Sequence, residues 1–133
     1  MKCEKTLDEV RKLFAGDRFA TENGAVIEEI GKCSATCSLV ITDSHRNAMG
    51  AVMGGTYFML ADFAFAVAAN WEKMRCVSLR SDIPFLGAAK GNKLIAKAVC
   101  LKDGRTTACY RVDVTDAYGN LTATVTTTGY HIG

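Results

Sequence analysis

The hydrophobic positions of this chain follow two different spacings, one helical and one strand-like. The helical spacing comes first, in residues 6–14, which open with a Thr-x-x-Glu capping box. Four apolar side chains of this segment fall on one helical face: Leu7, Val10, Leu13 and Phe14. Gly16 follows as a stop signal. The pattern predicts a short amphipathic helix that packs on the rest of the protein.

A strand-like spacing follows in residues 25–31 and 32–41, which are predicted to be two strands joined at Gly31 and Lys32. Apolar and polar positions alternate in the second segment, which predicts one buried face made of Cys33, Ala35, Cys37, Leu39 and Ile41. Residues 42–55 are rich in Gly, Asn and Ser and are expected to form a loop.

Residues 56–71, TYFMLADFAFAVAANW, show no alternation and contain no Gly or Pro. They are predicted to form one helix about 24 Å long. Because this helix is apolar nearly all round, we expect the rest of the domain to wrap it. Residues 48–69 are also long enough to cross a bilayer, but Asp62 near the middle would cost about 2.5 to 3.5 kcal/mol there. A core helix is therefore favoured, and no membrane association is expected.

The remainder of the chain is predicted to be strand, with turn signals between the segments 74–86, 91–102, 106–116 and 120–130. In the last segment Leu121, Ala123 and Val125 alternate with threonines, which indicates one dry face and one wet face. Short turns imply antiparallel pairing, and the apolar helix is expected to fill the concave face. The predicted class is α+β, with an antiparallel sheet wrapped around one long central helix in a single domain, residues 1–133.

Composition and charge narrow the function. The 133 residues suffice for one core, and a net charge of +2 is too weak to indicate a nucleic-acid partner. The chain has six cysteines, and its charged N-terminus lacks the apolar run of a signal peptide, so reduced thiols and a cytoplasmic location are expected. Cys33 and Cys37 are four apart and no CxxC pair appears, so we expect core cysteines and no metal.

Asp62 is the carboxylate inside the apolar helix and the first candidate for chemistry. Its mid-helix position excludes N-capping, and its neighbours in sequence offer no cation. A buried carboxylate without a partner either faces a cavity or has a raised pKa, and both suit a catalytic base; a structural carboxylate is the alternative. Gly54 and Gly55 stand directly before the helix, whose first N–H groups can hold an oxyanion; a plain tight turn is the alternative.

The stretch HRNAMGAVMGGTYFMLAD, residues 45–62, resembles the active-site segment of hotdog-fold acyl-CoA thioesterases of the phenylacetate-degradation (PaaI-like) type. VSLRSDIPFL and DGRTTACYRVDVTDAYGNLTATVTTTGY are similar to later strands of that family, so the resemblance covers roughly residues 24–131. It implies hydrolysis of an acyl-CoA, or a related acyl thioester, to free acid and thiol. No metal or bound cofactor is implied, because coenzyme A is part of the substrate.

The resemblance also implies roles for individual residues. Asp62 matches the family's acidic base or nucleophile, and Gly55 matches the oxyanion-hole N–H donor. Asn47 matches the side chain beside the thioester carbonyl or the attacking water, and Ser78 matches a Ser or Thr that orients water. Met53 is a departure, because it precedes Gly54 and Gly55 where the family has His-Gly-Gly. A hydrogen-bonding side chain is therefore missing at the pocket mouth.

Met53 motivates an alternative function, a catalytically weak or silent acyl-CoA or acyl-carrier binding protein of the same fold. A dehydratase or hydratase of that fold is a further alternative, and it would need a His with an acidic partner. His45 is expected to be a loop residue with a structural or solvent role, and His131 is interpreted as incidental near the C-terminus.

Substrate contacts beyond the motif are less specific. Lys90, Lys93 and Arg105 lie near predicted strand ends and are candidates for the phosphates of coenzyme A, with solvated surface charge as the alternative. An apolar acyl pocket or plain core accounts equally for Met53, Met59, Phe58, Phe63 and Phe65. The sequence does not identify the acyl group.

The spacing of Gly55 and Asp62 bears on assembly. Asp62 lies seven positions beyond Gly55, so on one helix they share a face but lie about 10 Å apart along the axis. One thioester carbonyl cannot contact both. If both act on one carbon, Asp62 of a second chain must lie opposite this Gly55, which predicts a homodimer with shared active sites. The resemblance also implies pairing and further assembly, as in a homotetramer built as a dimer of dimers.

Overall fold

The computed structural model describes residues 5–132. Helices α1 (Leu7–Phe14) and α2 (Arg18–Glu22) precede strands β1 (Val26–Gly31) and β2 (Ser34–Val40). A 3-10 turn, η1 (Asp43–His45), leads into the long helix α3 (Gly54–Asn70). Four strands follow: β3 (Cys76–Asp82), β4 (Lys93–Asp103), β5 (Thr107–Asp116) and β6 (Leu121–His131).

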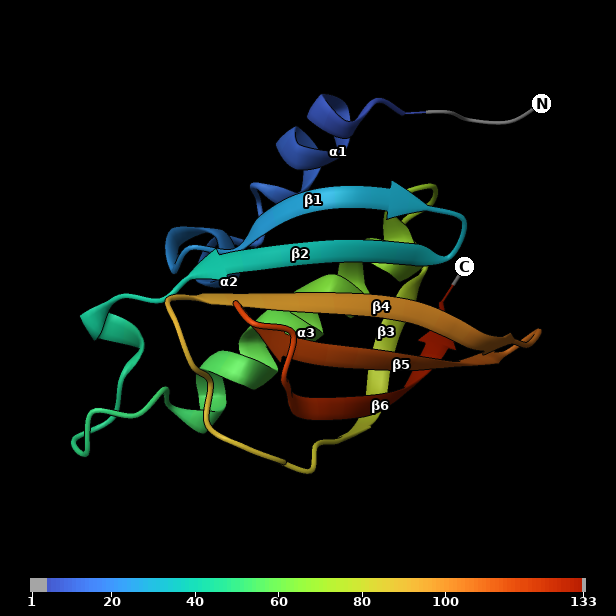
Figure 1. Ribbon diagram of the computed structural model, residues 1–133. Coiled ribbons are helices and arrows are strands. Elements are labelled where there is room, and N and C mark those ends of the chain that lie inside the picture. Colours follow the sequence, from blue (N-terminus) through green and yellow to red (C-terminus); the bar gives the residue numbers. More distant parts are fainter. Residues whose placement is uncertain (1–4, 133) are drawn as a thin grey trace.

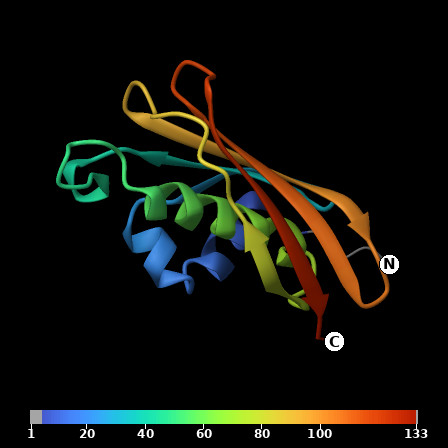
Figure 2. The same cartoon turned by 90° about the horizontal axis from the view of Figure 1, so that it is seen from below.

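The six strands form one antiparallel sheet in the order β1-β2-β4-β5-β6-β3. Figure 1 shows the sheet with α3 running across the face behind it. In the view of Figure 2, α3 lies between the sheet and the two short helices α1 and α2. The predicted α+β class, an antiparallel sheet around one long helix, is confirmed.

The first helix forms for the reason that its sequence indicates. Thr6 Oγ1 accepts the Glu9 N–H at 3.2 Å, and the Glu9 carboxylate accepts the Thr6 N–H at 2.9 Å, so the capping box closes. Val10 and Phe14 are buried, and the Phe14 ring meets the Phe63 ring edge-on with centroids 6.2 Å apart. This contact holds α1 against α3.

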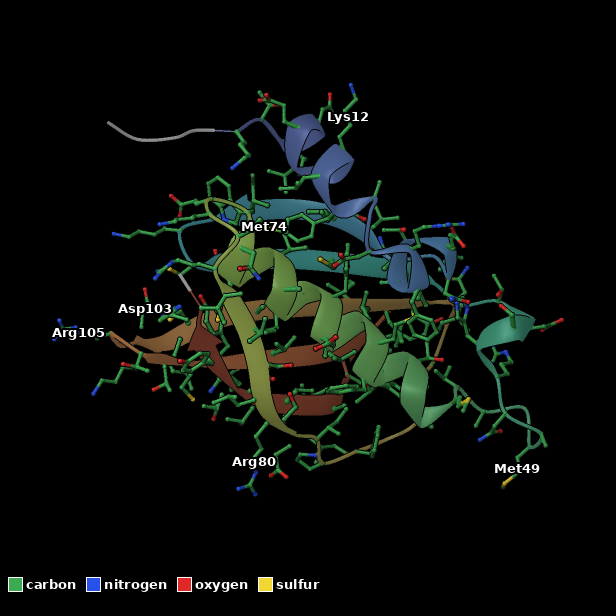
Figure 3. All side chains as sticks on the ribbon, turned by 180° about the vertical axis from the view of Figure 1, so that it is seen from behind. Lys12, Met49, Met74, Arg80, Asp103 and Arg105 are labelled. Carbon is green, nitrogen blue, oxygen red and sulfur yellow. The ribbon has the colours of Figure 1, made fainter. Side chains whose placement is uncertain are left out.

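Helix α3 begins at Gly54, two residues earlier than predicted, and supplies much of the core: Leu60, Ala61, Ala64 and Val67 are fully buried. The domain wraps most of this helix, as expected, but one of its faces stays partly open. Figure 3 views the molecule from this side, with α3 in front of the sheet. Helices of eight and five residues cannot cover a helix of 17 residues.

The turn between β1 and β2 differs from the prediction by one residue. Gly31 pairs with Ser34, so the turn consists of Lys32 and Cys33 rather than Gly31 and Lys32. Cys33 has φ +51° and is only partly buried, so it does not belong to the buried strand face. Ala35, Cys37, Leu39 and Ile41 are buried as predicted.

The start of β6 also departs from simple alternation. Leu121 is 45% exposed and Thr122 only 1%, the reverse of the predicted faces. The cause is a register shift against β5 between Val114 and Thr115, which turns the Thr122 hydroxyl inward to donate to the Val114 carbonyl at 2.9 Å. From Ala123 onward the predicted alternation holds.

The five cysteines after residue 4 carry free thiols, and Cys3 lies outside the described residues. Burial raises the pKa of Cys37 to about 12, as is typical of a core thiol. Between residues 5 and 132, no three His, Cys, Asp or Glu side chains gather in a way that would hold a metal ion. Across the same residues, no helix has the length and apolarity needed to cross a membrane.

Candidate active site

A cleft of about 540 Å³ lies where α2 approaches the open face of α3. Its walls are mostly apolar, and three charged side chains reach it. The lining residues are Asp17, Arg18, Phe19 and Ala20 from the α2 side, and Gly55, Phe58, Met59, Asp62, Phe63 and Ala66 from α3. Gly55 and Asp62, the two residues whose spacing suggested a site, therefore open onto one space.

Asp62 projects into this cleft rather than into the core. The sequence suggested a buried carboxylate, but Asp62 is exposed in the single chain because the cleft is open to solvent. Partial burial among the apolar walls raises the pKa of Asp62, and the nearby Asp17 carboxylate raises it further. Within the described part of the chain, no hydrogen bond lowers that pKa. Such a carboxylate is a better proton acceptor than an ordinary surface aspartate.

The N-terminus of α3 supplies donors at the other end of the cleft. Met53 occupies the N-cap position without a side-chain cap, and the Thr56 N–H is already bonded to the Met53 carbonyl at 2.9 Å. Gly54 and Gly55 are the first two helical residues, and no acceptor within residues 5–132 takes their N–H groups. These two N–H groups and the helix dipole together favour a negative charge at this end.

The two glycines have different surroundings. A Cβ at Gly54 would lie 3.2 Å from the Phe85 ring, so the close packing of Phe85 on the helix requires a small residue there. A Cβ at Gly55 would meet only the Met53 methyl group, at 4.0 Å. Gly55 therefore leaves its N–H approachable from the cleft, and Met53, 54% exposed, is the side chain that borders it.

His45 holds the loop before α3 in place. Its carbonyl accepts the Met53 N–H at 2.9 Å and the Thr56 hydroxyl at 3.2 Å. Its ring is buried, with Nδ1 accepting the Thr42 N–H at 3.0 Å, so Nε2 carries the proton and donates to the Asn23 carbonyl at 2.6 Å. Both ring nitrogens are engaged, which confirms the predicted structural role.

Asn47 shapes the loop that follows. Its side-chain oxygen accepts the Met49 and Ala51 N–H groups at 3.0 and 3.1 Å, which leaves its amide NH₂ as the group that can donate to a ligand. Ser78 is exposed on β3, one of the two edge strands of the sheet. Of the described residues, those that line the cleft do not include Asn47 or Ser78. One chain by itself does not bring these two side chains together with Gly55 and Asp62.

Of the three candidate phosphate ligands, Lys93 begins β4, and Lys90 and Arg105 lie far apart. Lys90 follows Ala89, whose N–H donates to the Tyr57 hydroxyl in the first turn of α3 at 3.0 Å. Arg105 lies in the β4–β5 turn, and β4 is 11 residues long, so the two are separated by roughly 33 Å of strand. Figure 3 shows Arg105 at the opposite end of the molecule from Met49 in the loop before α3. Of these two residues, Lys90 is therefore the one closer to the start of α3.

The sequence suggested that His131 is incidental near the C-terminus, but the structure gives it defined partners. It ends β6, pairs with Cys76 and donates from Nε2 to the Asp103 carboxylate at 2.8 Å. Arg75 approaches the same carboxylate at 3.4 Å. This cluster lies at the Arg105 end of the sheet, because Asp103 ends β4.

Helix α2 contributes residues that the sequence did not indicate. Asp17, Arg18 and Phe19 face Asp62 across the cleft, although the segment was not predicted to be helical. Five residues are too few to show a helical period. The only available signal was Asp17 after Gly16, since Asp is a common N-cap residue.

Comparison with known proteins finds relatives that are thioesterases or PaaI proteins. Residues 49–123 match the thioesterase superfamily. The acyl-coenzyme A thioesterase PaaI of Escherichia coli is 27% identical over 83% of this chain and 79% of its own. A mutant of the phenylacetic acid degradation protein PaaI from Thermus thermophilus superposes with a TM-score of 0.82 at 28% identity, over 87% of this chain and all of that one. A hypothetical thioesterase of Streptococcus pneumoniae, crystallised with coenzyme A, superposes with a TM-score of 0.82 at 26% identity. The superposition covers 90% of this chain and 97% of that one.

Proposed function

This chain belongs to the thioesterase superfamily, and from that premise we propose that it hydrolyses acyl-CoA thioesters to a free acid and free coenzyme A. Its PaaI-like hotdog fold and its relatives make it a thioester hydrolase. One observation supports the proposal further: Gly55 and Asp62 line the same cleft. An oxyanion donor and a base with a raised pKa are the two groups that this reaction needs.

The carbonyl end of the substrate is assigned to the N-terminus of α3. In this proposal the thioester oxygen accepts the Gly55 N–H, with Gly54 beside it, and the Asn47 amide donates to the carbonyl or to the attacking water. One such donor typically contributes about 2.7 to 4 kcal/mol to stabilising the tetrahedral intermediate. The free N–H groups of Gly54 and Gly55 support this assignment.

The base is assigned to Asp62 of a second chain. Asp62 lies seven positions beyond Gly55 in α3, about 10.5 Å along the axis, which is too far for one carbonyl to contact both. A two-fold dimer that packs the open face of α3 against its partner would place Asp62 of one chain opposite Gly55 of the other. The open face itself supports this arrangement, and a dimer of dimers is compatible with it.

The reaction then runs as a hydrolysis. Ser78 orients a water molecule, and Asp62 takes a proton from this water as its oxygen attacks the carbonyl carbon. The C–S bond then breaks, and the leaving thiolate receives the proton that Asp62 returns. Direct attack by Asp62 to give an anhydride is the other route, and water then hydrolyses the anhydride. Neither route, as proposed, uses a metal or a bound cofactor. Coenzyme A enters as part of the substrate.

The acyl group is assigned to the apolar part of the cleft. Phe19, Phe58, Met59 and Phe63 form its walls, which suits an apolar acyl chain or ring. Lys90, beside the first turn of α3, is the proposed partner of a coenzyme A phosphate. Arg105, at the other end of the sheet, would need a different portion of the substrate or a neighbouring chain.

Release of free thiol from a panel of short-chain, long-chain and aryl CoA esters tests the function. Turnover of at least one ester supports the proposal. Met53 favours one second candidate, a binding protein without activity, since it removes a hydrogen-bonding side chain from the pocket mouth. Displacement of a fluorescent CoA ester without any thiol release would favour that candidate.

A further inference from the structure

Asp17 has a carboxylate that its own helix does not use. It occupies the N-cap position of α2, yet its side chain makes no capping hydrogen bond. The backbone carbonyl of Asp17 makes the hydrogen bonds within α2 instead, accepting the Thr21 N–H at 3.0 Å and the Thr21 hydroxyl at 3.1 Å. An N-cap Asp usually accepts an N–H of the first turn, so this carboxylate serves no local purpose in α2.

The carboxylate of Asp17 lines the cleft that contains Asp62. The other charged group there is Arg18, whose guanidinium is engaged by Glu22 in the same helix. Helix α1 meets this part of α3 through an aromatic contact, Phe14 on Phe63. Of the charged groups that face Asp62 in the described chain, Asp17 is therefore the one that does not already have an opposite charge beside it.

Two carboxylates in one mostly apolar space influence each other's ionisation. Burial raises the pKa of both Asp62 and Asp17, and the charge of Asp17 adds to the shift on Asp62. When one group is ionised, it disfavours the charged form of the other, so the proton affinity of the pair is raised.

We propose that Asp17 is a positioning residue for thioester hydrolysis, which acts through Asp62 by holding a second carboxylate across the cleft and making Asp62 a stronger base. This inference rests on the proposed function, in which Asp62 removes a proton from water. Asp17 does not itself touch the reacting atoms in this scheme. Its contribution is a negative charge at the start of α2, outside α3, the helix that carries Gly55 and Asp62.

The test compares the pH dependence of kcat/KM in wild type, Asp17→Asn and Asp17→Ser. Asn and Ser are both good N-cap residues, so either keeps the start of α2 while removing the charge. Without that charge Asp62 ionises at lower pH, so the acid limb should move down by about half to one pH unit, as expected for a partly solvated like-charge pair. The plateau should fall by about twofold to threefold, because a weaker base accepts the proton less readily. Asp43→Asn, an exposed change of equal charge in η1, should leave the profile unchanged.

A second measurement needs no activity. Titration of the Asp62 carboxyl carbon by NMR should show the same downward move in Asp17→Asn and Asp17→Ser, and none in Asp43→Asn. Unchanged titration of Asp62 in both folded Asp17 variants, or a move to higher pH, would overturn the inference. Failure of the wild type to hydrolyse any CoA ester would instead contradict the proposed function, and the NMR titration would still decide whether Asp17 acts on Asp62.

Discussion

Gly55 and Asp62 border one cleft from the same face of α3, seven positions and about 10.5 Å of helix apart. An oxyanion donor and a base that act on one carbon cannot be that far apart along a single helix. Their separation is the reason why the proposed site combines groups from two chains. The predictions below test the groups at each end of it.

Replacement of Asp62 by Asn should abolish hydrolysis without loss of the fold. The amide is nearly isosteric but cannot accept a proton, so thiol release should fall by about 10² to 10⁴. The melting temperature should stay the same or rise, since the raised pKa of Asp62 means that its charge is disfavoured in the folded chain. Near wild-type turnover in the folded Asn variant would remove Asp62 from the mechanism. Asp43→Asn, outside the cleft, is the matched control.

Replacement of Met53 by His tests the departure from the family motif. Met53 borders Gly55 with its methyl group and is 54% exposed, so a His there has room to reach the carbonyl. If one helpful hydrogen bond is missing, kcat/KM on some ester should rise, by up to about tenfold. A folded His variant with no gain on any ester would indicate that the pocket has been rebuilt for another ligand.

Mixed dimers test whether the site is shared. Asp62→Ala and Asn47→Ala, each inactive as a homodimer, are unfolded, mixed in equal amounts and refolded. Random pairing makes about half of the dimers mixed, and each mixed dimer has one site with both defects and one with neither. About a quarter of wild-type activity should therefore return. If all groups act within one chain, nothing returns even when native mass spectrometry detects the mixed dimer.

Asp116→Asn should lower the folding stability of the protein, by an amount that depends on pH. The Asp116 carboxylate accepts N–H groups of Lys90, Tyr118 and Asn120 at 2.9, 3.0 and 3.0 Å, and these bonds lower its pKa to about 2, with the Lys90 bond the largest cause. A lowered folded-state pKa stabilises the protein above the usual value of 3.8, and the benefit is lost as the pH falls through about 2.

The melting temperature of Asp116→Asn should therefore be lower than that of wild type at pH 7, and the difference should shrink between pH 3.8 and pH 2. Activity is informative as well, because the same carboxylate fixes the backbone of Lys90. A rise in KM for CoA esters with kcat little changed would agree with Lys90 as a phosphate ligand. A gap in melting temperature that stays constant down to pH 2 would contradict the assigned pKa.

Local pattern was enough to predict most elements of this protein. The capping box at Thr6, the alternation of Ala35 to Ile41 and the mostly apolar run after Gly55 each act over a few residues, so they can be read without the fold. The same short range placed Gly55 and Asp62 on one helical face. Their spacing along a helix is a property of the backbone, whatever packs around it.

Tertiary structure decided what those residues face. The exposure of Asp62, the inward turn of Thr122 and the Nε2 bond of His45 to Asn23 depend on segments that are distant in sequence. Asp17 lies 45 positions before Asp62, at the N-cap of a helix of five residues, which is too short to show a helical periodicity in the sequence. Charges act across space, and the packing of α2 on α3, which brings these two carboxylates to one cleft, is set by long-range burial that no local pattern encodes.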